Sequence, residues 1–353
     1  MCINIIMIVL VSGGLGFIGS HTCLKLIENG HDVIIVDNLS NSNENVLGKI
    51  KFLTKKENIP LYKVDLVDYE KTKKIFNNNH IDAVIHFAGL KAVSESIEIP
   101  IKYYMNNLVS TLNLLNLCEE FNIDKFIFSS SATVYGSSKS PLSENSYIGE
   151  GITNPYGKTK YFCEHFLSDY AFANKNMKII PLRYFNPVGA HESGLLGEDP
   201  NDVPNNLMPF VIRVGAKNNI DNTLSDTYNE LQIFGNDYDT YDGTGVRDFI
   251  HVVDLAQAHV KALQKLDTLK TNYEVYNIGT GKGVSVLELV NAFAKVNDII
   301  VPYSIGKRRD GDIGEVYCTS SKAKEELGWV AIKTIDDICR DSYNFAKNKY
   351  KIN

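Results

Sequence analysis

The sequence predicts an α/β protein with a doubly wound parallel sheet and a second, smaller α/β domain. Short apolar runs alternate with stretches of helical periodicity through the first half of the chain. A glycine-rich turn directly follows the first apolar run, and 353 residues exceed one ordinary hydrophobic core. We expect a first domain over residues 1–186, a return segment to it near 246–256, and a second domain over 187–353.

Composition narrows the class of protein. Hydrophobic residues make up 44% and charged residues 22% of the chain, which are ordinary values for a soluble globular enzyme. A net charge of -6 argues against a nucleic-acid-binding protein, which normally carries a basic face. The six cysteines show neither a C-x-x-C pair nor metal-binding spacing, so we expect no metal and reduced, mostly buried thiols. The apolar run 3–11 lacks a basic leader and is too short to cross a membrane, which favours a cytoplasmic protein.

The first predicted unit is a strand over residues 3–11, a glycine turn, a helix that continues to about residue 29, and a strand over 32–37. Without side chains at Gly13, Gly16 and Gly19, the backbone can approach a pyrophosphate at the helix N-terminus. Asp37, at the end of the second strand, can accept hydrogen bonds from an adenosine ribose and would repel a 2′-phosphate. This arrangement is the dinucleotide fingerprint of the Rossmann fold, with NAD favoured over NADP.

The alternation continues with strands over 61–64, 83–87 and 125–128 and with helices over 68–77 and 100–122. Ligands of an open parallel sheet lie outside the carboxyl ends of its strands, where Asp65, Leu66 and the turn Phe87-Ala88-Gly89 fall. Asp65 also fits an ordinary helix cap. Ser129, Ser130 and Ser131 end the strand at 125–128, and they fit either a polar active-site floor or a solvated loop.

The stretch Asn154-Pro155-Tyr156-Gly157-Lys158-Thr159-Lys160 predicts the start of a helix, with Asn154 as its cap and proline in its first turn. Tyr156 and Lys160 are four residues apart and therefore share one helix face. An adjacent ammonium favours the ionised form of a phenol, so Tyr156 is a candidate proton acceptor with Lys160 as its activator. By itself, this pattern more often marks only an amphipathic helix face.

The second half of the chain is less regular. A strand ends near residue 186, Asn205-Asn206-Leu207-Met208-Pro209 opens a short helix, and the polar segment 217–230 predicts an exposed loop. A further strand is expected over 274–279, and helices at the C-terminal end. Dispersed arginines such as Arg247 and Arg309 suggest point contacts to phosphate, although surface charge is the better explanation of any single arginine.

From Val9 to about Trp329 the chain resembles the extended short-chain dehydrogenase/reductase family, and within it the UDP-glucose 4-epimerases. The glycine turn and Y-x-x-x-K are shared by the superfamily, whereas the other motifs are close to diagnostic. The motifs are GGLGFIGSHT at 13–22, VDNLSNS at 36–42, HFAGLKAVSES at 86–96, SSSATVYG at 129–136, NPYGKTK at 154–160, LRYFNPVGAH at 182–191, PNNLMP at 204–209 and FGNDYDTYDGTGVRDFIHVVDLA at 234–256.

The resemblance implies reversible interconversion of UDP-glucose and UDP-galactose by a transient oxidation at sugar C4 with tightly held NAD. It makes Tyr156 the base for the 4-hydroxyl proton, while hydride passes from C4 to the nicotinamide and later returns to the other face of the keto sugar. It makes Ser131 a hydrogen-bond partner of the 4-oxygen, and it makes Lys160 the residue that holds the nicotinamide ribose and lowers the pKa of Tyr156.

The resemblance also implies the binding residues. Those for NAD are Gly13, Gly16, Phe17, Ile18, Gly19, Asp37, Asn38, Asn41, Ser42, Asp65, Leu66, Phe87, Ala88, Gly89, Lys91, Asn106, Ser129, Tyr156, Lys160 and Phe185. Those for the UDP-sugar are Ser131, Tyr156, Asn186, Asn206, Leu207, Phe234, Arg247, Arg309, Asp312 and Val316. A homodimer through the helices around 101–121 and 156–173 is implied as well.

Two departures and two alternatives accompany this resemblance. The segment 217–230 is longer than the family's usual connection, and Val316 is small where a large aromatic would exclude N-acetylated sugars. We therefore expect some activity on UDP-N-acetylglucosamine. A sister nucleotide-sugar dehydratase needs an acid pair where this chain has Ala132 and Thr133. A non-catalytic NAD or nucleotide-sugar binder usually lacks the tyrosine or the lysine, and both are present here.

Overall fold

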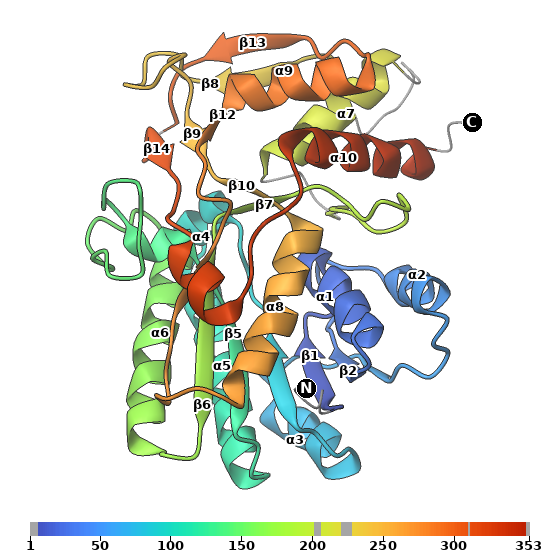
Figure 1. Cartoon of the computed structure of the whole chain (residues 1–353), viewed down its shortest axis with the longest axis vertical. Coiled ribbons are helices and arrows are strands. Elements are labelled where there is room, and N and C mark those ends of the chain that lie inside the picture. The colour runs from blue at the N-terminus through green and yellow to red at the C-terminus, as the bar shows by residue number, and fades with distance from the viewer. Residues whose placement is uncertain (1–5, 201–205, 220–227, 310, 351–353) are drawn as a thin grey trace.

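A computed structural model describes residues 6–200, 206–219, 228–309 and 311–350 (Figure 1). A seven-stranded parallel sheet forms the lower layer, in the order β11-β6-β5-β4-β1-β2-β3. The strands are β1 Ile8–Ser12, β2 Asp32–Val36, β3 Leu61–Tyr62, β4 Ala83–His86, β5 Lys125–Ser131, β6 Lys178–Tyr184 and β11 Tyr276–Ile278. The strand order turns back beside β1, so the sheet is doubly wound and the predicted fold class is confirmed.

Helices cover both faces of this sheet, because its strands carry apolar side chains on both sides. Val9 and Val11 of β1 point to a core shared with α1 Phe17–Glu28, α2 Asn45–Thr54 and α8 Val252–Leu266. Leu10, between them, points to the opposite core. The helices of that opposite core are α3 Tyr69–Asn78, α5 Pro100–Glu120 and α6 Pro155–Ala173.

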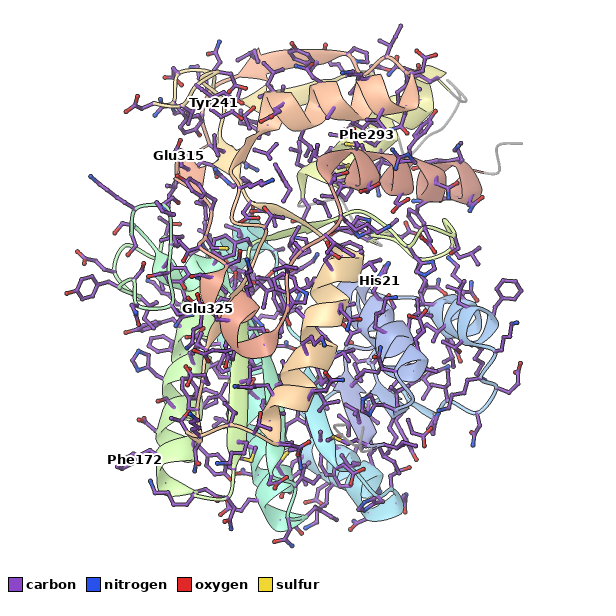
Figure 2. All side chains as sticks on the ribbon, in the orientation of Figure 1. His21, Phe172, Tyr241, Phe293, Glu315 and Glu325 are labelled. Atoms are coloured by element: carbon purple, nitrogen blue, oxygen red, sulfur yellow. The ribbon has the colours of Figure 1, made fainter. Side chains whose placement is uncertain are left out.

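A second layer lies above the carboxyl ends of the strands (Figure 1). Its strands are β8 Leu231–Phe234, β9 Val246–Arg247, β12 Val284–Ser285, β13 Tyr303–Gly306 and β14 Glu315–Val316. Its helices are α7 Leu207–Asn219, α9 Val286–Asn297 and α10 Ile335–Lys349. Phe293 packs edge-to-face on Tyr343 at 5.8 Å between α9 and α10, and Figure 2 labels Phe293 within this layer. The second layer therefore has its own apolar core.

Five short elements remain. They are β7 Asn186–Val188, β10 Phe249–His251, α4 Val93–Glu98, a 3₁₀ turn over Ala132–Tyr135 and a π-helical turn over Ala323–Leu327. β7 and β10 pair in parallel, and the chain then returns to the sheet through α8 and β11. Within the residues described, none of the helices is both long and apolar enough for a membrane span.

Several local predictions need correction. α7 continues to Asn219, so Lys217–Asn219 are helical rather than part of the predicted loop 217–230, and residues 220–227 of that loop lie outside the described residues. β5 extends to Ser131, so the three serines belong to the strand instead of following it. The expected first strand begins at Ile8, and residues 3–5 lie outside the described part. The five cysteines within the described residues are buried and free, as predicted.

Candidate active site

The glycine turn lies between β1 and α1, where the backbone passes close to the next strand. A Cβ on Gly13 would lie 2.8 Å from the Ala88 nitrogen, and Gly13 has a φ of +67°. A Cβ on Gly19 would overlap the Gly13 carbonyl oxygen. Gly16 caps α1 without a side-chain hydrogen bond, so the amides of the first turn remain available to a ligand. The turn therefore forms the cradle that a pyrophosphate requires.

Asp37 holds this turn from the end of β2. Its Oδ2 accepts a hydrogen bond from the Leu15 amide at 3.0 Å, and its Oδ1 accepts from the Leu39 amide at 2.9 Å and from the Ser42 hydroxyl at 2.7 Å. A carboxylate has about four acceptor positions, so one more hydroxyl donor can be accommodated. The buried carboxylate fits a ribose and disfavours a 2′-phosphate, which suits NAD.

A cavity of about 190 Å³ opens beside Asp37. Gly16, Phe17, Asn41 and Ser42 line one side of it, and residues 195–197 line the other. Ile18 is partly buried and packs on the core below the turn. Four residues expected to bind NAD, Gly16, Phe17, Asn41 and Ser42, therefore line one cavity.

The turns after β3 and β4 complete this side of the site. Asn38 donates to Asp65 at 3.4 Å, and the Asp65 carboxylate also accepts from the Val67 amide at 3.0 Å, so Asp65 is partly engaged in its own turn. Leu66 is buried, and the Phe87 ring packs on His259 at 4.7 Å. Ala88 donates its amide to the Ser12 hydroxyl at 3.4 Å.

Asn107 is a site residue that the sequence analysis missed. Its Oδ1 accepts from the Leu90 amide at 2.8 Å, and its Nδ2 donates to the Leu90 carbonyl and to Thr159 Oγ1, both at 3.0 Å. The predicted neighbour Asn106 only donates to Asn107, at 2.9 Å. Asn107 therefore fixes the turn after Gly89 to α6. The sequence did offer a signal for Asn107, because a polar amide on the apolar face of the helix predicted over 100–122 needs hydrogen-bond partners.

Helix α6 begins as predicted. Asn154 caps it by accepting a hydrogen bond from the Gly157 amide at 2.8 Å, and Pro155 occupies the first turn. This cap places Tyr156 beside the end of β5, where Ser131 interacts with the Tyr156 hydroxyl and acts to lower its pKa. Ser131 also accepts from Thr133 Oγ1 at 3.0 Å.

The charge that acts on the pKa of Tyr156 differs from the expectation, which was Lys160. Burial raises the pKa of Tyr156, whereas the hydrogen bond with Ser131 and the positive charge of Lys91 act to lower it. The nearby charge therefore comes from Lys91, in the turn after β4, and not from Lys160. In the protein alone, the phenol is mostly protonated at neutral pH.

Lys160 lies on the same face of α6 as Tyr156, but its ammonium is bound to the backbone of β5. Its Nζ donates a 2.6 Å hydrogen bond to the Ser129 carbonyl oxygen and lies 4.8 Å from the centre of the Phe128 ring. Burial lowers the pKa of Lys160 to about 8. A Cβ on Gly89 would lie 3.9 Å from this Nζ, so Lys160 faces the turn after β4.

The acid Glu198 links two predicted site residues, and the sequence analysis did not identify it. Its Oε1 lies 3.0 Å from Lys91 Nζ and accepts a 2.6 Å hydrogen bond from Asn206 Nδ2. Leu207 follows at the start of α7. Glu198 lies in an irregular segment between β7 and α7, so no periodicity could mark it.

Several of the residues expected to bind the UDP-sugar lie in the second layer. The Arg309 guanidinium lies 5.0 Å from the centre of the Phe234 ring and forms a 2.9 Å ion pair with Asp312. Arg247 donates to the carbonyl oxygens of Val246 at 2.8 Å and Gly314 at 3.3 Å, and burial lowers its pKa. The charges of Asp312 and Arg309 act on the pKa of Arg247, so two guanidinium groups and one carboxylate lie close together. Strand β9 carries Arg247, and the segment between β13 and β14 carries Arg309 and Asp312.

Val316 lies in the short strand β14. It pairs with Arg247 in the β9–β14 ladder and packs on the apolar cluster that contains Phe185. Asn186 continues the chain from Phe185 and donates its amide to the Asp248 carbonyl at 2.9 Å. Val316 is therefore partly buried at the junction of the two layers.

Comparison with known proteins agrees with this geometry. The family model of the NAD dependent epimerase/dehydratase family matches residues 9–279. UDP-glucose 4-epimerase of Bacillus subtilis is 49% identical over 349 residues, covering 98% of this chain and 99% of the relative. UDP-glucose 4-epimerase 2 of Arabidopsis thaliana is also 49% identical, covering 96% of this chain and 95% of the relative.

Solved structures show the same similarity. The UDP-glucose 4-epimerase of Bifidobacterium longum, crystallised with NAD+ and UDP, has a TM-score of 0.90 and 48% identity and covers 98% of this chain and 99% of its own. The enzyme of Stenotrophomonas maltophila, with bound NAD and formylated UDP-arabinopyranose, has a TM-score of 0.91 and 42% identity over 98% of this chain and all of its own. The chain belongs to the NAD-dependent epimerase/dehydratase family.

Proposed function

We propose that this protein interconverts UDP-glucose and UDP-galactose with NAD as its cofactor. The observation that carries the proposal is that Ser131, at the end of β5, interacts with Tyr156, in the first turn of α6. Full-length relatives at 48–49% identity that are UDP-glucose 4-epimerases support the same activity. We also propose that residues 187–353 contribute most of the UDP-sugar contacts, while residues 1–186 and the return segment hold NAD.

The residues of the chain have separate tasks in this proposal. NAD, bound along the glycine turn and Asp37, supplies a reversible hydride acceptor for sugar C4. Tyr156 removes the proton of the 4-hydroxyl and returns it after the sugar has turned, and Ser131 holds the 4-oxygen. Lys160 binds the nicotinamide ribose, for which its ammonium is well placed beside Gly89 and Ser129.

The arginine group provides the charge complement of a diphosphate. Arg247 and Arg309 offer guanidinium forks that match phosphate oxygens, and Asp312 can accept from the hydroxyls of a uridine ribose. The Phe234 side chain is 38% exposed and offers a flat apolar face beside them. These contacts hold UDP at the second layer and leave the hexose toward Tyr156.

A coupled assay of purified protein with UDP-galactose, without added NAD, tests the function. We expect conversion to UDP-glucose, because NAD is tightly held in the proposed site. If conversion occurs only after NAD is added, the proposed activity stands, but NAD is not tightly bound. No conversion under either condition contradicts the proposed function.

Two other functions have less support. A dehydratase needs an acid pair next to Ser131, where the 3₁₀ turn carries Ala132 and Thr133. A binder without catalysis would not require the hydrogen bond between Tyr156 and Ser131.

Activity on UDP-N-acetylglucosamine is a second candidate function, and Val316 is the observation that favours it. Its small side chain at the junction of the layers leaves room beside the sugar C2 substituent. A 35% identical UDP-Glc/GlcNAc 4-epimerase of Campylobacter jejuni has a similar fold, with a TM-score of 0.80. We expect turnover of both substrates, and we expect Val316→Tyr to lose only the N-acetyl activity. Full glucose activity with undetectable N-acetyl activity in the parent protein contradicts this candidate.

We further propose a homodimer and a cytoplasmic location. Large apolar side chains are exposed along α5 and α6, and Figure 2 labels Phe172, which is 78% exposed, at the outer edge of α6. The others on these helices are Ile101, Met105, Leu112 and Phe162. Such a surface is expected to pack against a second copy. The five buried free cysteines within the described residues suit a reducing compartment.

A further inference from the structure

Lys49 is a charged residue of the cavity beside Asp37 that the function described so far does not use. It lies in α2, and together with Gly16 and Phe17 it lines the cavity of about 190 Å³. Its side chain is partly buried, and its ammonium lies 6.0 Å from the centre of the Phe345 ring. Among the residues that the structure describes, Lys49 forms no ion pair. The cavity therefore has a cation in its wall without a carboxylate partner.

The carboxylates around this part of the chain are engaged by other lysines. Asp199 is the other charged residue in the wall of the cavity, and it forms a 2.7 Å ion pair with Lys349. Glu44, which precedes α2, forms a 2.5 Å ion pair with Lys63. Neither acid therefore neutralises Lys49, and the cavity is left with a surplus of positive charge.

Two helix N-termini add to this positive charge. Gly16 and Phe17 lie at the start of α1, Asn45 and Val46 at the start of α2, and all four line the cavity. The two helices pack against each other (Figure 1). Neither N-cap residue, Gly16 or Glu44, makes a side-chain hydrogen bond to its helix. Since the N-terminus of a helix carries a partial positive charge, this cavity suits an anion.

Phe345 favours a position of the Lys49 side chain at the cavity wall. The Phe345 ring is 5% exposed, and a Cβ on Gly197 would lie 2.5 Å from it, so the ring packs directly on the backbone at 197. Both Phe345 and Gly197 line the cavity. An ammonium is attracted to the face of an aromatic ring, so the ring stabilises Lys49 beside the glycine turn.

We propose that Lys49 binds the pyrophosphate of NAD and supplies the charge that the backbone amides of the glycine turn lack. This inference rests on the proposed function, in which NAD lies along that turn. The pyrophosphate carries the negative charge of NAD, and a lysine ammonium binds phosphate oxygens as a point charge. Lys91 and Lys160, the lysines already expected to bind NAD, do not line this cavity. Lys49 therefore adds a contact at the opposite part of the cofactor from theirs.

Three variants test the charge of Lys49. Lys49→Met removes the ammonium and keeps most of the apolar stem, whereas Lys49→Arg keeps a positive charge. Lys51→Met is the matched control, because Lys51 lies in the same helix, is also partly buried and does not line the cavity. The measurement is the rate at which NAD leaves the purified holoenzyme at low and at high ionic strength, with circular dichroism as the check of folding.

We expect NAD to leave Lys49→Met at least about tenfold faster than the parent at low ionic strength, as expected for a lost contact to a charged group. High ionic strength should speed the release from the parent more than from Lys49→Met, because salt screens a charge that the variant no longer has. Lys49→Arg and Lys51→Met should release NAD at rates near that of the parent.

Equal release rates, or an equal dependence on salt, in the parent and a folded Lys49→Met protein would overturn the proposal. The affinities for NAD and NADP after release of the bound cofactor distinguish the two kinds of phosphate. Both dinucleotides contain the pyrophosphate, so Lys49→Met should weaken both alike, and a loss confined to NADP would assign Lys49 to the 2′-phosphate and overturn the proposal. If Lys49→Met does not fold, Lys49→Gln replaces it under the same criteria.

The release of NAD does not depend on turnover, so this test is separate from that of the proposed function. A parent protein that holds NAD but does not convert UDP-galactose contradicts the proposed function, and the comparison of release rates still decides the role of Lys49. If the parent is purified without NAD, the calorimetric affinity for added NAD replaces the release rate, with the same tenfold difference expected.

Discussion

At the scale of single residues, Tyr156 and Ser131 are the groups that we propose for the chemistry of this site. The phenol is partly buried, and burial raises its pKa, so it needs help to act as a base at neutral pH. Ser131 and Lys91 provide part of that help. The positive nicotinamide of NAD is expected to add to it.

Replacing Tyr156 with phenylalanine removes the proton acceptor and little else. We expect kcat to fall about a hundredfold or more, the usual contribution of a positioned acid–base group. NAD content and melting temperature should stay close to those of the parent. Tyr147→Phe is the control, since Tyr147 is 86% exposed. Unchanged turnover in Tyr156→Phe would transfer the base role to another group.

The lowered pKa of Lys160 predicts that the free energy of unfolding depends on pH. Its folded-state pKa is about 8 against an ordinary 10.5, so the unfolded chain binds more protons between these values, and parent stability gains as the pH rises through this window. Lys160→Met lacks this titration. We expect the parent's unfolding free energy, relative to that of Lys160→Met, to rise by roughly 3 kcal/mol from pH 8 to 10.5. Denaturant titrations measure it.

Lys158→Met controls for the loss of a lysine from α6, because the side chain at 158 is exposed. Its unfolding free energy should follow the parent's at every pH. Parallel curves for the parent and Lys160→Met would show that Lys160 is not desolvated as described.

At the scale of elements, the turn between β1 and α1 depends on the absence of a side chain at Gly19. A Cβ there would overlap the Gly13 carbonyl oxygen, which is backbone and cannot move aside. We expect Gly19→Ala to lose NAD on gel filtration and to destabilise the fold by about 1–3 kcal/mol, as overpacking does. Gly48→Ala in α2 meets nothing within 4 Å and should be neutral or slightly stabilising. A Gly19→Ala protein with full NAD content contradicts the cradle.

The N-cap of α6 links local structure to catalysis. Asn154→Ala removes the hydrogen bond to the Gly157 amide, with an expected loss of about 1 kcal/mol in denaturant unfolding. We also expect a lower kcat, because Tyr156 lies in the turn that this cap fixes. Asp68 caps α3 in the same way but is not among the residues expected to contact NAD or the UDP-sugar, so Asp68→Ala should destabilise the fold without changing kcat. If Asn154→Ala and Asp68→Ala have the same kcat, the N-cap of α6 does not affect catalysis.

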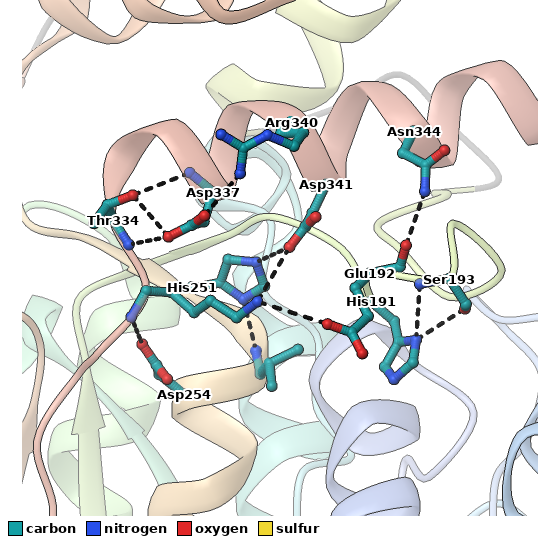
Figure 3. Close-up of polar contacts among 12 residues, drawn as sticks. His191, Glu192, Ser193, His251, Asp254, Thr334, Asp337, Arg340, Asp341 and Asn344 are labelled. Carbon is teal, nitrogen blue, oxygen red and sulfur yellow. Dashed lines mark hydrogen bonds and ion pairs between the residues drawn. The ribbon is translucent and has the colours of Figure 1, made fainter.

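At the scale of the whole molecule, a polar network joins the C-terminal helix to the junction of the layers (Figure 3). Asp341 of α10 accepts from His251 at 3.1 Å and lies 3.6 Å from Lys333, and Lys333 lies 4.0 Å from Glu192. This network holds the hairpin 190–197 over the cavity beside the glycine turn. Residues from the last helix of the chain therefore support a site formed near its beginning.

The homodimer is tested on the exposed face of α5. Ile101 is 73% exposed, and a glutamate there would bury a charge in the proposed interface. We expect sedimentation velocity to show a dimer for the parent and a monomer for Ile101→Glu. Phe52→Glu changes a 75% exposed side chain on α2 and should remain dimeric. A monomeric parent contradicts the proposal.

The sequence by itself determined the parallel sheet, and it predicted the residues of the reaction. Periodicity, the glycine turn and the Tyr156–Lys160 spacing are local features, and helix and strand geometry convert them directly into position. The helix predicted from Asn154 starts where its cap lies, and the strand order turns back as a doubly wound sheet requires.

Only the tertiary structure decided which charges meet. Lys91 rather than Lys160 lowers the pKa of Tyr156, and Glu198 joins Lys91 to Asn206. These residues come from separate turns, and no spacing along the chain records their distance. Burial sets the pKa of Lys160 in the same way, because desolvation depends on every element packed around a side chain.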